Sequence, residues 1–186
     1  MSLTADRARL LQLLRELSFE RRKVTLASGK ESDFYIDCKR TALTAEGHVL
    51  IGRCLFERVR KVRPLVRGVG GLTLGADPLA SAIALTSFLE HEPVDAFIVR
   101  KEPKGHGTGQ WIEGRQTIPD GSRVAVLEDV VTTGGSARKA IERCRAEGLV
   151  VVACFALVDR GEGGREAIEA QGVPLDALFA RGDFLE

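Results

Sequence analysis

VAVLEDVVTTGGS, residues 124–136, joins an apolar run to a loop of threonine, glycine and serine. The β-branched residues of the apolar run are typical of a strand buried in a parallel sheet. The two glycines allow a tight turn with exposed amide groups, and residues 136–147 have helical character. Because the amino terminus of a helix attracts phosphate, residues 124–147 are predicted to form a strand, a phosphate-binding loop and a helix.

Two adjacent carboxylates, Glu128 and Asp129, stand where the predicted strand ends. Carboxylates do not suit a phosphate, but they accept hydrogen bonds from hydroxyl groups, and a sugar diol is the natural candidate. Ligands of open α/β sheets bind at the carboxyl ends of the strands, so we interpret the segment as a ribose 5-phosphate site. The alternative is a strand, turn and helix that bind nothing. Neither the P-loop motif nor the dinucleotide-binding glycine motif is present at this strand.

The composition is that of one ordinary globular domain. A chain of 186 residues can build a core, and its net charge of +1 gives no overall attraction to nucleic acid or membranes. We expect no membrane span and no signal peptide, because apolar runs are short and residues 1–16 are charged throughout. The cysteines form no Cys-x-x-Cys pair, which disfavours disulfides or zinc and predicts a reducing cytoplasm. They are Cys38, Cys54, Cys144 and Cys154.

Strand-like and helix-like segments alternate from residue 44 onward, which predicts a parallel, doubly wound sheet with helices on both faces. Gly70 and Gly71 are expected to end the third strand. The expected strands are 24–28, 34–37, 65–69, 94–99, 124–127, 149–158 and 175–180. The expected helices are 5–17, 44–61, 76–89, 136–147 and 165–171. A basic cluster on and after the second helix is interpreted as a solvated helix face rather than a nucleic-acid patch. Its members are Arg53, Arg58, Arg60, Lys61 and Arg63.

Two further segments offer sites for phosphate groups. Residues 100–110 place three cations and a histidine in a long loop, which suits a highly charged leaving group such as pyrophosphate. The alternative is an exposed loop with incidental charge, and Trp111 is expected to anchor its base. Residues 70–79 form a glycine-rich turn between a strand and a helix, which suits a second phosphate or is a plain turn.

Two other segments offer contacts for a base. Phe34 and Tyr35 follow a glycine turn and can shape a pocket for a flat ring, although a hairpin with packed aromatic rings is an equal alternative. Arg160 leaves the sheet at the same edge as Glu128 and can bind a carboxylate through two hydrogen bonds. The alternative for Arg160 is a surface ion pair with Asp159 or Glu162.

Together these segments resemble the type I phosphoribosyltransferase family over about residues 20–170. Residues 127–136 resemble its binding motif for phosphoribosyl pyrophosphate. Residues 100–107 with 112–114 resemble the loop of members that act on orotate rather than on purines, and residues 28–37 and 159–164 resemble that group too. The resemblance implies an α/β fold with a central parallel sheet flanked by helices. It also implies a single domain, 1–186, with an N-terminal hood at about 1–40 and a flexible catalytic loop at 101–111.

The implied activity is transfer of ribose 5-phosphate from phosphoribosyl pyrophosphate to orotate in pyrimidine (UMP) synthesis, with Mg²⁺ and in a homodimer with shared sites. The resemblance assigns catalysis to Lys101, Lys104, His106 and Asp129. It assigns phosphoribosyl pyrophosphate to Arg100, Lys101, Lys104, His106, Glu128, Asp129, Val130, Val131, Thr132, Thr133, Gly134, Gly135 and Ser136. It assigns orotate to Thr132, Arg160, Phe34 and Tyr35. Mg²⁺ is expected to bind mainly through the substrate, with Asp129 as the candidate protein ligand.

The chain departs from this pattern at two places. Some orotate enzymes have lysine where this chain has Ala27 and Leu74, and Lys30 and Lys39 are candidates to replace those cations. Two rival functions remain, a phosphoribosyltransferase for another base and a non-catalytic regulator that senses nucleotides or binds nucleic acid. About 20 residues precede the first core strand, which is too few for a helix-turn-helix.

Overall fold

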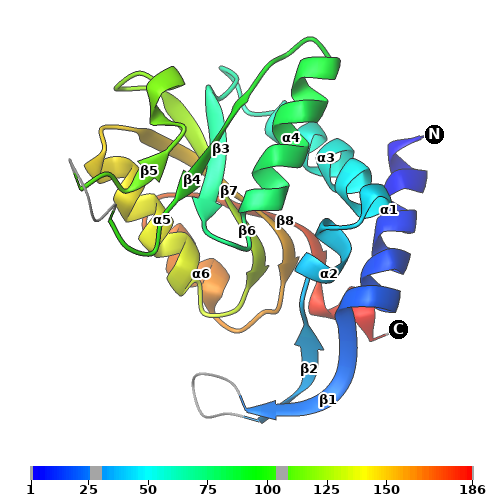
Figure 1. Cartoon of the computed structure of the whole chain (residues 1–186). Coiled ribbons are helices and arrows are strands. Elements are labelled where there is room, and N and C mark those ends of the chain that lie inside the picture. The colour runs from blue at the N-terminus through cyan, green and yellow to red at the C-terminus, as the bar shows by residue number, and fades with distance from the viewer. Residues whose placement is uncertain (1, 26–30, 104–108, 186) are drawn as a thin grey trace.

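A six-stranded sheet forms the centre of the computed structural model, which describes residues 2–25, 31–103 and 109–185 (Figure 1). The strand order is β5-β4-β3-β6-β7-β8, and every pairing is parallel except that of β4 with β5. The strands are β3 Gly68–Leu72, β4 Asp95–Val99, β5 Ile112–Glu113, β6 Arg123–Val131, β7 Val150–Asp159 and β8 Leu175–Ala180. The central, mostly parallel sheet is as predicted, and the short antiparallel edge strand β5 was not expected.

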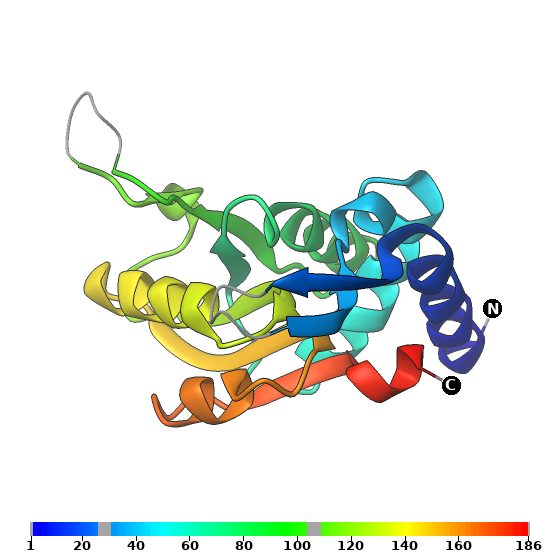
Figure 2. The same ribbon diagram turned by 90° about the horizontal axis from the view of Figure 1, so that it is seen from below.

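Helices cover both faces of this sheet, as predicted (Figures 1 and 2). Side chains of β6 alternate between two cores: Leu127 packs with the first group of helices and Val126 with the second. Burial on both faces explains the continuous apolar run of β6. The first group is α1 Leu3–Leu13, α3 Ala45–Val59 and α4 Asp77–Leu89, and the second is α5 Gly135–Ala146 and α6 Gly164–Glu169. The remaining helical turns are Leu14–Ser18, α2 Lys39–Ala42, Arg115–Thr117 and Arg181–Phe184.

The prediction that Gly70 and Gly71 end a strand is wrong, because both lie inside β3. A Cβ atom on Gly70 would overlap the carbonyl oxygen of Phe97 in β4, and one on Gly71 would overlap that of Leu127 in β6. Neighbouring strands approach so closely here that glycine is required. The strand therefore ends at Leu72, and the turn that follows lies at the edge where β6 also ends.

An N-terminal hairpin forms a separate two-stranded antiparallel sheet, β1 Phe19–Thr25 with β2 Glu31–Ile36. It lies across the edge of the main sheet where the parallel strands end (Figure 2). The observed strands begin earlier in the chain than predicted, since β1 contains the charged run Glu20-Arg21-Arg22-Lys23, which has no apolar alternation. Residues 26–30, with Ala27 and Lys30, lie outside the described residues.

All four cysteines are buried and free. Burial raises the pKa of every one of these thiols, to about 11 for Cys54 and about 12 for Cys144. They therefore act as small apolar side chains. No helix within the described part of the chain is both long enough and apolar enough to cross a bilayer.

Candidate functional site

The loop between β6 and α5 forms a small cradle at the edge of the sheet. Its turn depends on Gly134, whose backbone has φ +76° and whose added Cβ atom would lie 2.8 Å from the carbonyl oxygen of Gly164. No side chain caps the start of α5, so its first amide groups are available to an anion. A cavity of about 120 Å³ opens here, which suits one group of a larger ligand. Its lining is Glu128, Val130, Val131, Thr132, Thr133, Gly134, Gly135 and Ser136, all predicted from the sequence.

The two carboxylates at the end of β6 have different environments. Glu128 is 7% exposed, and burial raises its pKa to about 9, with the charge of Asp129 adding to the shift. Asp129 accepts a hydrogen bond from the amide of Val130 at 2.9 Å, and its side chain is 13% exposed. Glu128 therefore carries a proton in the free protein at neutral pH, and a hydroxyl ligand would meet one neutral and one more exposed acid.

The second glycine-rich turn reaches the same carboxylate. A Cβ atom on Gly75 would overlap Oδ1 of Asp129, so glycine allows the turn before α4 to touch Asp129. The amide of Thr73 donates to the carbonyl of Val99 at 2.9 Å, and its hydroxyl donates to Asp77 at 2.6 Å. These bonds hold the turn beside Asp129, where its amides suit a second phosphate group.

Lys39 supplies a cation close to Asp129. Its Nζ lies 3.8 Å from Oδ2 of Asp129 and 2.7 Å from Oδ1 of Asp37. Burial acts to lower the pKa of Lys39, but the hydrogen bond to Asp37 and the charge of Asp129 outweigh it, so the pKa is raised. Leu74, by contrast, is 68% exposed at the tip of its turn. Lys39 was named from the sequence as a replacement cation, but its pairing with Asp129 depends on the tertiary fold.

Arg160 lies at the end of β7, next to the cradle. Its amide donates to the carbonyl of Val131 at 3.0 Å, and its guanidinium, 8% exposed, donates to the carbonyl of Phe34 at 3.1 Å. Oε1 of Glu162 lies 2.8 Å from Nη2 of Arg160. The ion pair expected as one alternative is therefore present, but it is mostly buried rather than on the surface.

The structure corrects the prediction that Phe34 and Tyr35 together shape an aromatic pocket, because their side chains point to opposite faces of β2. The ring of Phe34 is fully buried and packs 4.9 Å from the ring of Phe19 and 5.7 Å from that of Phe184. Tyr35 is half-buried, and the guanidinium of Arg22 stacks on its ring at 4.0 Å. Successive strand residues face opposite sides, so Phe34, and not Tyr35, lies toward Arg160: its carbonyl accepts from the guanidinium, which also lies 5.4 Å from the centre of the Phe34 ring.

The described part of the cationic segment after β4 does not join this cluster. Arg100 pairs with Glu113 at 3.0 Å, Lys101 is exposed, and residues 101–103 and 109–111 run outward from the body of the protein (Figure 2). Trp111 anchors the base, as expected: its carbonyl accepts from the amide of Arg100 at 2.9 Å, and the guanidinium of Arg143 stacks on its ring at 3.3 Å. Lys104 and His106, two of the predicted catalytic residues, lie outside the described residues.

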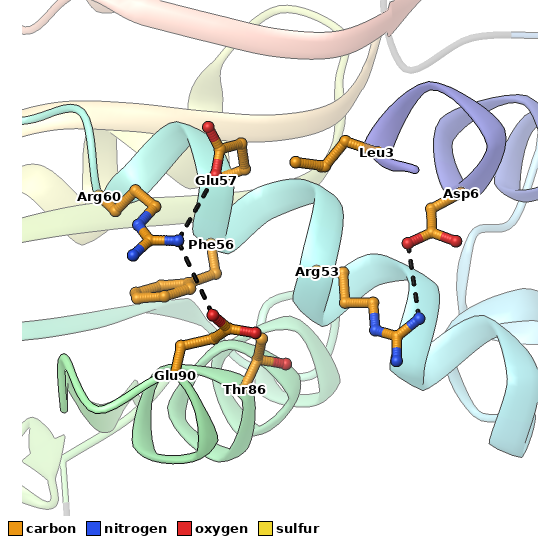
Figure 3. A pocket seen from close by; sticks show the side chains of 8 residues that line it. All are labelled: Leu3, Asp6, Arg53, Phe56, Glu57, Arg60, Thr86 and Glu90. Atoms are coloured by element: carbon orange, nitrogen blue, oxygen red, sulfur yellow. Dashed lines mark ion pairs between the residues drawn. The ribbon is translucent and has the colours of Figure 1, made fainter. Parts of the chain in front are cut away.

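A separate cavity of about 300 Å³ lies between α1, α3 and α4 (Figure 3). Arg60 stands between Glu57 and Glu90 at 3.8 and 3.9 Å, and Arg53 pairs with Asp6 at 3.5 Å. The basic cluster on α3 is thus neutralised by acids, which supports a helix face over a nucleic-acid patch. None of the residues predicted for substrates or catalysis lines this cavity.

Glu128→Gln should stabilise the free protein at alkaline pH. The folded pKa of about 9 lies above the ordinary value of 4.5, so Glu128 contributes stability that is complete below about pH 4.5 and is lost as the pH rises to about 9. Glutamine mimics the protonated acid, so the variant should gain about 1–3 kcal/mol near pH 8 and almost nothing near pH 5. Thermal unfolding without ligands from about pH 5 to 9 measures this, with Glu102→Gln at an exposed acid as control. If the unfolding temperatures of wild type and Glu128→Gln changed equally with pH, this would contradict a buried, protonated Glu128.

A sequence profile of the phosphoribosyl transferase domain matches residues 69–171. The chain is 53% identical to the orotate phosphoribosyltransferase of Sorangium cellulosum, over 97% of this chain and 94% of the relative. It is 48% identical to the orotate phosphoribosyltransferase of Aquifex aeolicus, over 98% of this chain and 100% of the relative. A structure of the Mycobacterium tuberculosis orotate phosphoribosyltransferase in complex with phosphoribosyl pyrophosphate superposes with a TM-score of 0.78 at 40% identity, over 97% and 99%. The adenine phosphoribosyltransferase of Leishmania tarentolae, 19% identical with a TM-score of 0.68, shares the fold.

Proposed function

The chain belongs to the phosphoribosyltransferase family and, within it, to the orotate phosphoribosyltransferases, and on this premise we propose how its residues carry out the reaction. Ribose 5-phosphate passes from phosphoribosyl pyrophosphate to orotate, giving orotidine 5-monophosphate and pyrophosphate in pyrimidine synthesis. The bond from C1 of the ribose to pyrophosphate breaks, and a bond from C1 to the ring nitrogen forms. The observation that carries the proposal is the cradle of residues 130–136, with Glu128 in its lining, Asp129 next to it and the amide of Arg160 bonded to the carbonyl of Val131.

The amides at the start of α5 bind the 5-phosphate, and Glu128 and Asp129 bind the ribose hydroxyls. Positive charge develops on the ribose as pyrophosphate departs, and the carboxylate of Asp129 stabilises it without a covalent intermediate. Binding at both ends of the sugar holds C1 in place for attack by the base, which lowers the entropic part of the barrier. Support comes from Glu128 and residues 130–136, which line one cavity, and from Gly75, which lets the turn before α4 lie against Asp129.

Mg²⁺ is the proposed cofactor, and the residues present fit it. The described residues hold no cluster of three or more metal-ligating side chains, so these residues by themselves offer no complete cage. Mg²⁺ commonly binds through one or two carboxylates together with substrate phosphates and water, and Asp129 at the rim of the cradle offers such a carboxylate. When bound with pyrophosphate, it would neutralise charge on the leaving group.

Orotate is proposed to lie between the cradle and Arg160, with Thr132 beside it and its carboxylate on the guanidinium. Arg160→Ala should therefore raise the orotate KM about 10- to 100-fold and change that for phosphoribosyl pyrophosphate much less. Steady-state kinetics with each substrate varied separately measures both constants. Arg145→Ala, at an exposed arginine farther along α5, is the control. Equal increases in both KM values would argue against the carboxylate contact.

A homodimer with shared sites is proposed from an exposed apolar face. Leu85, Phe88 and Leu89 of α4 are 56%, 70% and 66% exposed, and Leu74 before the helix is 68% exposed. Large apolar side chains gathered on one face are typical of a protein interface. A second copy on this face would give the outward segment around Lys101 a neighbouring site to reach, as the family resemblance implies. The four free, buried cysteines support a reducing cytoplasm as the compartment.

The loss of orotate absorbance tests the proposed activity directly. Absorbance should fall only when phosphoribosyl pyrophosphate and Mg²⁺ are both present, and chelation should stop it. Adenine and guanine in place of orotate test the rival base specificity. A DNA mobility-shift assay tests a regulatory role. Turnover of a purine at the orotate rate, or DNA binding without turnover, would overturn the proposal.

A further inference from the structure

The carboxylate of Glu162 lies against the guanidinium of Arg160. Its Oε1 lies 2.8 Å from Nη2 of Arg160, and the two side chains are only 18% and 8% exposed. The approach is close but is not an aligned hydrogen bond. A ligand carboxylate could approach the planar guanidinium with better alignment, because the favoured geometry is two parallel hydrogen bonds.

The backbone around Glu162 forms a turn that brings its side chain against Arg160. Gly161 and Gly163, on either side, have φ +68° and +85°, and a Cβ atom on either would meet nothing within 4 Å. Glycine is therefore required at these positions by the left-handed conformation rather than by crowding. The amide of Gly161 donates to Asp159 at 2.9 Å, which fixes the start of the turn.

A second ion pair, which does not include Glu162, connects the turn to the sheet. Arg165 lies 3.1 Å from Oδ2 of Asp159, and this pair connects α6 to the end of β7. Gly164, next along the chain, contacts Gly134 of the phosphate cradle. The connection of the turn to the sheet therefore does not depend on Glu162.

We propose that Glu162 neutralises Arg160 in the free protein and gives way to the carboxylate of orotate, which makes Glu162 a specificity-determining residue. The inference rests on the proposed contact between Arg160 and orotate. Two carboxylates on one mostly buried guanidinium would leave a net negative charge in a poorly solvated place, so they compete. Glu162 therefore lowers the affinity of the site for any carboxylate and protects Arg160 from free anions.

Glu162→Gln should lower the orotate KM about tenfold, with a much smaller change in the KM for phosphoribosyl pyrophosphate. Benzoate, a flat ring with a carboxylate, should become a competitive inhibitor against orotate with an inhibition constant about tenfold lower than in wild type. Uracil, which has no carboxylate, should inhibit both proteins equally. Glu166→Gln, the same charge change at an exposed acid of α6, should alter none of these constants.

Glu162→Asp keeps the charge on a shorter side chain and provides a second variant if Glu162→Gln does not fold. It should lower the orotate KM in the same direction by a smaller factor. A higher orotate KM in Glu162→Gln, restored by Glu162→Asp, would overturn the inference and leave Glu162 a residue that only orients Arg160. An unchanged orotate KM in Arg160→Ala would instead remove the proposed carboxylate contact, so the two failures are distinguishable.

Discussion

Asp129→Asn should lower kcat/KM for phosphoribosyl pyrophosphate by about 10²- to 10³-fold. Asparagine keeps the size of the side chain and can still accept the hydrogen bond from the amide of Val130. It loses the negative charge that faces the ribose, and that charge is most valuable when positive charge develops at C1 in the transition state. Initial rates of orotate consumption at varied phosphoribosyl pyrophosphate measure the loss.

The remaining contacts of Asp129 indicate that this variant folds. Lys39, which pairs with it at 3.8 Å, keeps a closer partner in Asp37 at 2.7 Å. Circular dichroism and the unfolding temperature should therefore stay close to wild type, which separates catalysis from stability. Asp120→Asn, at a side chain that is 89% exposed, controls for the loss of one carboxylate. Near-normal activity in Asp129→Asn would contradict the proposed contact between Asp129 and the ribose hydroxyls.

Lys101→Ala should be nearly inactive alone and should recover activity when mixed with Asp129→Asn. The segment that carries Lys101 runs outward, away from the cradle of its own chain, so a homodimer would present it to the partner's site. In a two-fold dimer of one copy of each variant, both defects fall in one site and the other site is intact. Each verified mixed dimer should therefore show about half of the wild-type activity.

Phe88→Asp makes the mixing experiment sharper. Phe88 is 70% exposed on α4, so a charge there should weaken the proposed interface without disturbing the core. Mixtures carrying Phe88→Asp in both chains should sediment as monomers and recover no activity. No recovery in mixed dimers verified by two affinity tags would count against shared sites, even if the chain is dimeric.

The central part of the fold was predictable because its signals are local. The apolar run of β6, the acids after it and the glycine loop are contiguous, so the cradle lining was named in full from sequence order. The parallel sheet with helices on both faces follows from the alternation of strands and helices, although the order of the strands does not. The boundaries of the hairpin differ from the prediction because β1 contains a charged run without apolar alternation. Backbone hydrogen bonds, rather than a pattern of side chains, pair β1 with β2.

The positions of single residues across elements could not be predicted in the same way. The sequence predicts that a strand ends at Gly70, because the crowding against Phe97 that requires glycine exists only once β3 and β4 pair. Phe34 was assigned to an aromatic pocket, but its ring joins a core with Phe184, which is distant in sequence. These outcomes depend on which neighbours the tertiary fold supplies.

The sequence by itself determined the class of fold, the phosphate cradle and the acids beside it, because each depends on residues a few positions apart. The tertiary structure decided which groups surround these features. It places Gly75 and Lys39 next to Asp129, and it places the carbonyl of Phe34 next to the guanidinium of Arg160. Even Glu162, two residues from Arg160, reaches the guanidinium only through a turn with two left-handed glycines. Such contacts depend on packing distances between elements, and local propensity does not encode these distances.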